Sequence, residues 1–273
     1  MSFLIIVLLA IVQGVTEFLP ISSSGHLLLF YKIFNIESGT LFVSILLHVA
    51  TFFSIVVYYR KELWEYLKNF KSKTTIKFII TTLATIIIVL LFKKILIGAY
   101  SGSILIWCFI ITSIMLFVAE QISSCHKYTN ILTKTNNNMT KSFTFSFNSI
   151  NYLKAGVIGI VQGFAVLPGI SRSGSTIATA LILGADKKES ADYSFIISLP
   201  IVVASLVFEI AEFVKTPEVI PFSVFEMAVG FIIAFVVGYL SIKLLLKLIK
   251  KQRLTFFSFY LLFLCIVMLI FGL

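Results

Sequence analysis

The sequence predicts an all-α polytopic membrane protein with an inverted-topology repeat, built from about six transmembrane helices and two re-entrant helix–loop–helix hairpins. Three observations predict this fold class. Of the 273 residues, 59% are hydrophobic and only 12% are charged, whereas a soluble domain has about 25% charged residues. Six long apolar segments recur along the chain. Two shorter segments, one in each half, are copies of each other.

The two copies read IVQGVTEFLPISSSGHL at 11–27 and IVQGFAVLPGISRSGST at 160–176, and eight of their 17 aligned positions are identical. They differ in the residues that could carry chemistry. The first copy contains Glu17 and His26, and the second has Arg172 where the first has Ser23. A repeated frame with an acid and a base in one half and a fixed cation in the other predicts one composite site for an anionic group.

Apolar segments of spanning length lie at 40–59, 76–92, 103–120, 190–211, 222–242 and 254–272, and a transmembrane helix needs about 20 apolar residues. The copies lie in residues 1–34 and 155–185, which are apolar but interrupted by Gly, Pro and Ser. Irregular backbone is tolerated at membrane depth only where it is buried in protein or lines a wet cavity. We therefore expect two re-entrant hairpins, although two full crossings per hairpin would give the same topology.

Each hairpin is followed by three spans, so the two halves should have opposite orientations, an arrangement that places a site near the membrane midplane. The predicted units are a first repeat at 1–120, a flexible cytoplasmic linker at 121–154 and a second repeat at 155–273. The linker is rich in Asn, Thr, Ser and Lys.

The net charge is +10, and fifteen of the 22 Lys and Arg residues fall within 60–77, 121–154 and 243–253. Basic runs can indicate nucleic-acid binding. Here they flank apolar spans, so the positive-inside rule explains them better and places all three segments on the cytoplasmic side. We expect no nucleic-acid partner. We expect anionic lipid head groups to contact Lys243, Lys247, Lys250, Lys251 and Arg253.

The N-terminus has no basic n-region or cleavage site, so we do not interpret it as a cleaved signal peptide. Cys108, Cys125 and Cys265 have no paired spacing, which predicts neither a disulfide framework nor a metal site.

Gln13 and Glu17 are four residues apart and share one face of a helix. A carboxylate in an apolar segment is costly and usually lines a functional cavity. Glu17 is therefore a candidate site residue, although an interfacial position or a hydrogen bond to backbone would also accommodate it.

Pro20 and the run Ser22–Ser23–Ser24–Gly25 end one helix and begin another. Helix N-termini present free N–H groups and bind phosphate, but serines are also ordinary N-caps. His26 follows this run and could take a proton, attack phosphorus or bind phosphate. His48 stands alone in an apolar span, where we expect at most a supporting role.

Arg172 lies between Ser171 and Ser173 in PGISRSGST. A guanidinium offers a rigid fork of donors that matches phosphate oxygens. A buried arginine needs an anionic partner, which Glu17 could supply at rest and a phosphate would supply better. Thr176 could add a hydroxyl or be an ordinary cap.

These residues resemble a known family. QGVTEFLP with ISSSGH, and LPGISRSGST, are similar to the two signature motifs of the bacterial undecaprenyl-pyrophosphate phosphatase family, which is linked to bacitracin resistance. The resemblance covers nearly the whole chain. It implies hydrolysis of undecaprenyl pyrophosphate to undecaprenyl phosphate and inorganic phosphate, which recycles the lipid carrier of cell-wall synthesis.

The resemblance also implies a divalent cation, Mg²⁺ or Ca²⁺, and a possible homodimer. It further implies a location in the bacterial cell membrane, with the active site open to the extracytoplasmic face. The implied catalytic residues are Glu17, Ser23, His26 and Arg172. Glu17 and Gln13 would bind the metal, and Gln13 leaves only one motif carboxylate for it. The expected substrate-binding residues are Gln13, Ser22, Ser24, Gly25, Ser171, Ser173, Gly174 and Thr176.

We expect Ser23 to be the nucleophile and His26 its base, with attack by His26 or by water as open alternatives. Arg172 would hold the pyrophosphate, and the prenyl tail would lie between spans. The alternative function is a transporter or flippase for a phosphorylated polyprenyl lipid or another anion. The combination of Glu17, Ser23 and His26 favours the enzyme, because transport does not need a nucleophile beside a base.

Overall fold

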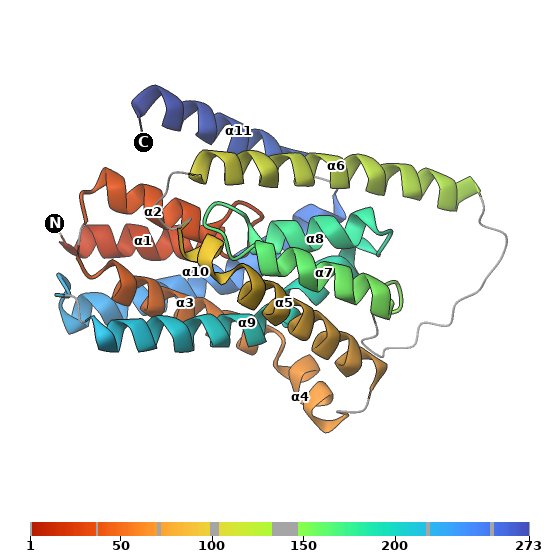
Figure 1. The fold of residues 1–273 in the computed structure, drawn as a ribbon, viewed down its shortest axis with the longest axis horizontal. Helices are drawn as coiled ribbons and strands as arrows, with labels where there is room; N and C mark the ends of the chain where they lie inside the picture. Colours follow the sequence, from red (N-terminus) through yellow and green to blue (C-terminus); the bar gives the residue numbers. More distant parts are fainter. Residues whose placement is uncertain are drawn as a thin grey trace.

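The structure, a computed structural model, describes residues 2–36, 38–69, 72–98, 104–132, 147–216, 219–251 and 254–272. Every regular element in this part of the chain is an α-helix (Figure 1). Within the described residues, six helices are long and apolar enough to cross a membrane: α3 (Thr40–Tyr58), α5 (Lys73–Gly98), α6 (Leu105–Leu132), α9 (Lys187–Lys215), α10 (Val224–Lys250) and α11 (Leu254–Phe271). They confirm the six predicted spans, and the chain is an all-helical, multi-pass membrane protein.

Four shorter helices form the two predicted helix–loop–helix units: α1 (Ser2–Thr16) with α2 (Ser23–Ile33), and α7 (Tyr152–Phe164) with α8 (Arg172–Ile182). At 1.5 Å per residue these helices are about 16–22 Å long. The hydrocarbon core of a bilayer is about 30 Å thick. Their lengths favour re-entry over full crossing, and re-entry itself stays a prediction.

Each hairpin packs against a span of the other half, α1 on α10 and α7 on α5. The repeated glycines Gly14 and Gly163 permit these contacts. A Cβ atom on Gly14 would lie 2.9 Å from Val237 Cβ, and one on Gly163 would lie 2.6 Å from Ile88 Cβ. Small residues at such interfaces let backbones approach closely, because packing rather than the hydrophobic effect drives helix association in lipid. A two-fold repeat would produce this pattern, in which the hairpin of each half packs on a span of the other half. The opposite orientation of the two halves in a membrane stays a prediction.

Two threonines of α5 hold α7 by hydrogen bonds between helices. Thr81 Oγ1 donates to Ala155 O over 3.0 Å, and Thr85 Oγ1 donates to Gly159 O over 2.9 Å. The threonines are four residues apart and therefore lie on one face of α5. Shared hydroxyl–carbonyl bonds of this kind fix the position of a hairpin against its span.

The turns of the two hairpins meet inside the molecule. A Cβ atom on Gly25 would lie 3.1 Å from Gly169 Cα, and Ser173 Oγ donates to Leu19 O over 3.3 Å. Gly169 has φ 94°, a left-handed conformation that favours glycine. These close contacts bring the two copies of the repeated sequence to one place.

Two features differ from the sequence-based expectation. Helix α6 continues to Leu132 and α7 begins at Tyr152, so helix occupies both ends of the expected linker 121–154. The Asn-rich run within 133–146 lies outside the described residues. The basic segment 60–77 contains a short helix, α4 (Arg60–Lys68), that we did not predict. Its exposed Trp64 and Leu67 are typical of an amphipathic helix at a membrane interface.

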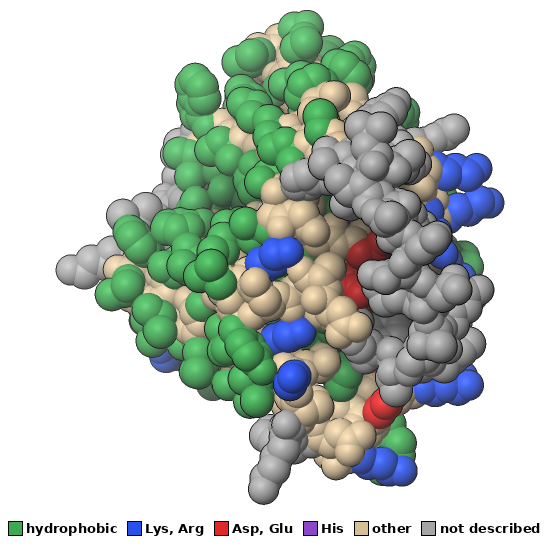
Figure 2. All heavy atoms as spheres, turned by 90° about the vertical axis from the view of Figure 1, so that its right-hand side faces the viewer, with side chains coloured by type: hydrophobic (Ala, Val, Ile, Leu, Met, Phe, Trp, Pro, Cys, Tyr) green, Lys and Arg blue, Asp and Glu red, His purple; other side chains and the backbone are tan. Residues whose placement is uncertain are grey.

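Helices α3 and α10 end on the side of the molecule where α4 lies, toward the right of Figure 1. We call this the basic end, because it contains Lys61, Lys68, Lys247, Lys250 and Lys251. Figure 2 views the molecule from this side and shows Lys and Arg side chains spread over it. The sequence predicts this clustering of Lys and Arg residues. The assignment of this end to the cytoplasm stays a prediction.

Replacing Gly163 with alanine should lower the thermal unfolding midpoint of the protein in detergent, because the new Cβ would lie 2.6 Å from Ile88 Cβ. Overpacking of this kind typically costs about 1–3 kcal/mol. Gly156→Ala is the matched control, since its Cβ would meet Ile80 Cγ2 at 3.9 Å. An unchanged midpoint in Gly163→Ala would contradict the close α5–α7 contact.

A cysteine at the exposed Ser38, in a background without the native cysteines, should react with a membrane-impermeant maleimide added outside intact cells. Lys251→Cys, at the basic end, should react only after the membrane is opened. The reverse pattern would show that the basic end faces outward and that the predicted topology is inverted.

Candidate active site

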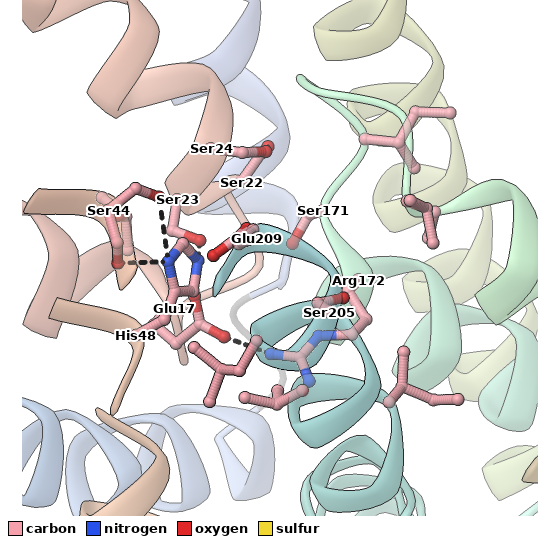
Figure 3. A pocket seen from close by; sticks show the side chains of 17 residues that line it. Glu17, Ser22, Ser23, Ser24, Ser44, His48, Ser171, Arg172, Ser205 and Glu209 are labelled. Atoms are coloured by element: carbon pink, nitrogen blue, oxygen red, sulfur yellow. Dashed lines mark hydrogen bonds and ion pairs between the residues drawn. The ribbon is translucent and has the colours of Figure 1, made fainter. Parts of the chain in front are cut away.

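A cavity of about 140 Å³ opens where the two hairpin turns face α3 and α9 (Figure 3). Its polar lining comes from both halves of the chain: Thr16, Glu17, Ser22, Ser23, Ser24, Ser44, His48, Ser171, Arg172, Ser205 and Glu209. Its apolar lining includes Ile201, Val202 and Leu206 of α9. The repeated motif, whose two copies differ in their charged residues, predicts one composite polar site of this kind.

Glu17 is the centre of this site. It directly follows α1, and its side chain is only 5% exposed. Ser23 Oγ donates to Glu17 Oε2 over 2.5 Å, and Gln13 Nε2 donates to the same oxygen over 3.1 Å. Arg172 forms an ion pair with the other carboxylate oxygen. Each carboxylate oxygen therefore has a partner, as a buried charge requires.

Arg172 is the first residue of α8 and reaches Glu17 from the opposite hairpin (Figure 3). Its Nη2 contacts Glu17, whereas its buried Nη1 has no hydrogen-bond partner. A buried donor without a partner is costly. A phosphate oxygen in the cavity would supply the missing acceptor, because a guanidinium binds phosphate through two parallel donors.

The serines of both copies begin the second helix of each hairpin. Ser22 Oγ accepts from Gly25 N–H at 3.4 Å, and Ser171 Oγ accepts from Gly174 N–H at 3.0 Å. The identical Ser-x-x-Gly spacing is thus an N-cap in both copies. The first turns of α2 and α8 border the cavity, and helix N-termini with positive dipole ends suit an anion.

Ser23 differs from Ser22 and Ser24 in the hydrogen-bond partner of its hydroxyl. Its hydroxyl points to the Glu17 carboxylate, whereas Ser22 caps α2 and Ser24 Oγ lies 3.5 Å from Ser22 Oγ. A short hydrogen bond from a hydroxyl to a carboxylate is the contact through which a serine can lose its proton as it attacks.

His26 does not line the cavity in this structure. Its Nδ1 lies 2.7 Å from Ser22 O, so Nδ1 carries the hydrogen, because a carbonyl only accepts. Its Nε2 lies 2.8 Å from the Tyr260 hydroxyl, which donates to Nε2 when the ring is neutral. Phe109 packs edge-on against the imidazole. Both ring nitrogens have partners, and the role of His26 as a base stays a prediction.

The remaining predicted residues lie behind the cavity wall. Gly25 and Gly174 make close backbone contacts at the hairpin turns. Ser173 bonds the opposite turn, and Thr176 Oγ1 donates to Arg172 O over 2.8 Å. Gln13 reaches the site only through Glu17. These residues support the shape of the site, and direct contact with substrate stays a prediction for each.

Two titratable residues of the spans, His48 and Glu209, also line the cavity. His48 of α3 places Nδ1 2.8 Å from Ser44 O and Nε2 3.8 Å from Glu17 Oε2. Glu209 of α9 lines the cavity, and its buried Oε2 has no hydrogen-bond partner. We gave His48 a supporting role and did not consider Glu209. The signal for both was the same as for Glu17, an ionisable side chain within an apolar span.

Glu17 and Glu209 place two carboxylates on this cavity, a donor set that would suit a divalent cation shared with a substrate, and cation binding stays a prediction. Glu17 supplies a carboxylate, and Gln13 Oε1 and Glu209 Oε2 are buried acceptors without partners. No group of three or more His, Cys, Asp or Glu among the described residues could hold a metal by itself. Mg²⁺ is commonly bound by one or two carboxylates together with substrate phosphates, so the donor set suits that mode.

The fold and the cavity define a polytopic membrane protein with a buried polar cavity that is formed by two copies of one motif. The chain belongs to the bacitracin resistance protein BacA family, whose family model matches residues 6–267. It is 35% identical to an undecaprenyl-diphosphatase of Methanococcus vannielii over 93% of this chain and 94% of that protein. An undecaprenyl-diphosphatase of Carboxydothermus hydrogenoformans is also 35% identical, over 93% and 91% of the two chains. Undecaprenyl-diphosphatase 4 of Bacillus thuringiensis subsp. konkukian is 33% identical, over 95% and 93%.

Replacing Arg172 with alanine should weaken the binding of inorganic pyrophosphate by about ten- to a hundredfold, as measured by calorimetry, because hydrogen bonds to charged groups contribute about 1.5–3 kcal/mol. Arg172→Lys keeps the charge and loses the fork, so its affinity should be intermediate. Ser24→Ala should have a small effect. Wild-type affinity in a folded Arg172→Ala protein would exclude this residue from the anion site.

Proposed function

We propose that this chain hydrolyses undecaprenyl pyrophosphate to undecaprenyl phosphate and inorganic phosphate. The observation that carries the proposal is the contact of the Ser23 hydroxyl with the buried Glu17 carboxylate, in a cavity where Arg172 has an unused donor. The names of the related proteins support the same reaction. Release of the lipid phosphate would recycle the carrier of cell-wall synthesis.

The terminal phosphate of the substrate would occupy the cavity between the first turns of α2 and α8. Arg172 would donate from Nη1 to a phosphate oxygen, and exposed N–H groups of the two helix starts would add further donors. These donors are held in place before substrate arrives, because the serine caps and the contacts between the turns fix them. Preorganised donors of this kind stabilise charge that develops in the transition state.

Ser23 would attack the terminal phosphorus while its proton passes to Glu17. The bond between this phosphorus and the bridging oxygen breaks, and undecaprenyl phosphate leaves with the electron pair. Water then cleaves the phosphoserine and releases inorganic phosphate. The geometry favours Glu17 over His26 as the group that accepts the serine proton, because Ser23 Oγ already donates to Glu17. Attack by water that Glu17 orients is the remaining alternative.

A divalent cation, Mg²⁺ or Ca²⁺, would neutralise charge on the phosphate oxygens. Glu17 is the side chain best placed to hold it, with Glu209 as a second carboxylate on the cavity lining. Gln13 bonds Glu17 through its amide nitrogen and would support the site from behind the cavity wall. Binding of a phosphate by Arg172 would release Glu17 from its ion pair and make its carboxylate available.

The prenyl chain would leave the cavity along its apolar side. Ile201, Val202 and Leu206 line the cavity on α9, and the neighbouring Val203 and Val207 are exposed on the outside of the same helix. A path from polar cavity to lipid-facing surface suits a substrate with a charged head and an apolar tail. We also propose that the protein lies in the cell membrane with this cavity open to the extracytoplasmic face, and that it forms a homodimer.

The purified protein in detergent should release phosphate from undecaprenyl pyrophosphate, and a chelator should abolish the release. Ser23→Ala should lower the rate by at least about a hundredfold, since loss of a nucleophile removes the covalent step. Ser24→Ala is the matched control and should keep most activity. The assay measures inorganic phosphate and has no second compartment.

Activity in detergent also separates hydrolysis from transport, because a transporter or flippase would produce no phosphate under these conditions. Folded wild-type protein that releases no phosphate with either cation would refute the proposed reaction. Equal, mild losses in Ser23→Ala and Ser24→Ala would leave the reaction standing and favour water as the nucleophile.

A further inference from the structure

A second cavity, of about 390 Å³, opens at the basic end between the end of α3, the beginning of α9 and the last turns of α10. Four lysines line it: Lys188, Lys243, Lys247 and Lys250. None of its lining residues belongs to the cavity at the hairpin turns. It is therefore a separate site, although α3 and α9 border both cavities.

The lining is positively charged but contains a fixed carboxylate. Asp192 and Glu62 are its two acidic residues, so the four ammonium groups exceed the carboxylates by two. Asp192 is only 4% exposed, and its Oδ1 accepts a hydrogen bond from the Tyr59 hydroxyl over 2.7 Å. This buried pair joins α3 to α9 and fixes the wall of the cavity.

Three of the lysines form a row on one face of α10. Lys243, Lys247 and Lys250 follow each other at spacings of four and three residues, and like charges at these spacings destabilise a helix. No carboxylate of the described residues forms an ion pair within 4.0 Å with any of these three lysines. A bound anion would remove the repulsion.

We propose that this cavity binds a phosphomonoester group. The excess of two positive charges matches a group that carries close to two negative charges at neutral pH. The group could be the head of a lipid or free inorganic phosphate. Basic cavities between transmembrane helices commonly take lipid head groups. Leu246 lines the cavity, and Leu240 and Leu244 are exposed on the adjoining surface of α10. The inference does not depend on the proposed hydrolysis.

Calorimetry of the full-length protein in a non-ionic detergent tests this proposal. The background carries Arg172→Ala, which weakens phosphate binding at the first cavity. The titrants are dioctanoyl phosphatidic acid, dioctanoyl phosphatidylcholine and inorganic phosphate. The test variant is K243Q/K247Q/K250Q. The matched control is K61Q/K68Q/K251Q, which removes the same charge from exposed residues of the same end outside the cavity.

Phosphatidic acid should bind the background protein, and its affinity should fall at least about tenfold in the test variant and less than about threefold in the control. Phosphatidylcholine should not bind in this lysine-dependent way. Lysine-dependent binding of phosphatidic acid alone would assign the site to lipid heads, and equal affinity for inorganic phosphate would assign it to the free ion. Equal losses in the two triple variants, or no loss in a folded test variant, would overturn the proposal.

Discussion

The ion pair between Glu17 and Arg172 is the interaction on which the arrangement of the site depends. It joins the two copies of the repeated motif inside the molecule, where an unpaired charge of either sign would be strongly destabilising. Because each partner begins or ends a hairpin helix, the pair fixes the two turns against each other. The same pair leaves Arg172 Nη1 without an acceptor. The two charges of the resting site therefore neutralise each other, while one hydrogen-bond donor still lacks a partner. Such a site can exchange an internal carboxylate for a phosphate.

The repeated motif separates structural positions from chemical ones. Two pairs of identical positions have the same structural use in both copies: Gly14 and Gly163 pack against the opposite half, and Ser22 and Ser171 cap the second helix. The positions that differ supply the charges. Gln13 and Gln162 show the separation within one identical pair, since Gln13 bonds Glu17 and Gln162 bonds Thr85 of α5. A duplicated scaffold can therefore support a site that is not itself duplicated.

The two cavities differ in how their charge is arranged. At the hairpin turns, charges of both signs lie within a small, partly apolar space, where one hydroxyl contacts a carboxylate. That arrangement suits chemistry on a phosphate. At the basic end, lysines dominate, and the buried Asp192 is bonded to Tyr59 rather than to a candidate nucleophile. That arrangement suits binding alone. Both sites depend on α9, whose middle borders the first cavity and whose beginning borders the second.

By itself, the sequence determined the membrane class, the six spans and the two helix–loop–helix hairpins, and it indicated one composite site that contains Glu17 and Arg172. These follow from composition, apolar segment length and a repeat whose copies differ in charge, all of which are local properties. Tertiary structure decided which side chains share the cavity. It turned His26 toward Tyr260, placed Ser23 on Glu17, and brought His48 and Glu209 to the site from distant spans. The physical reason is that residue spacing fixes the face of a helix, whereas the contact between two faces depends on packing across the whole fold.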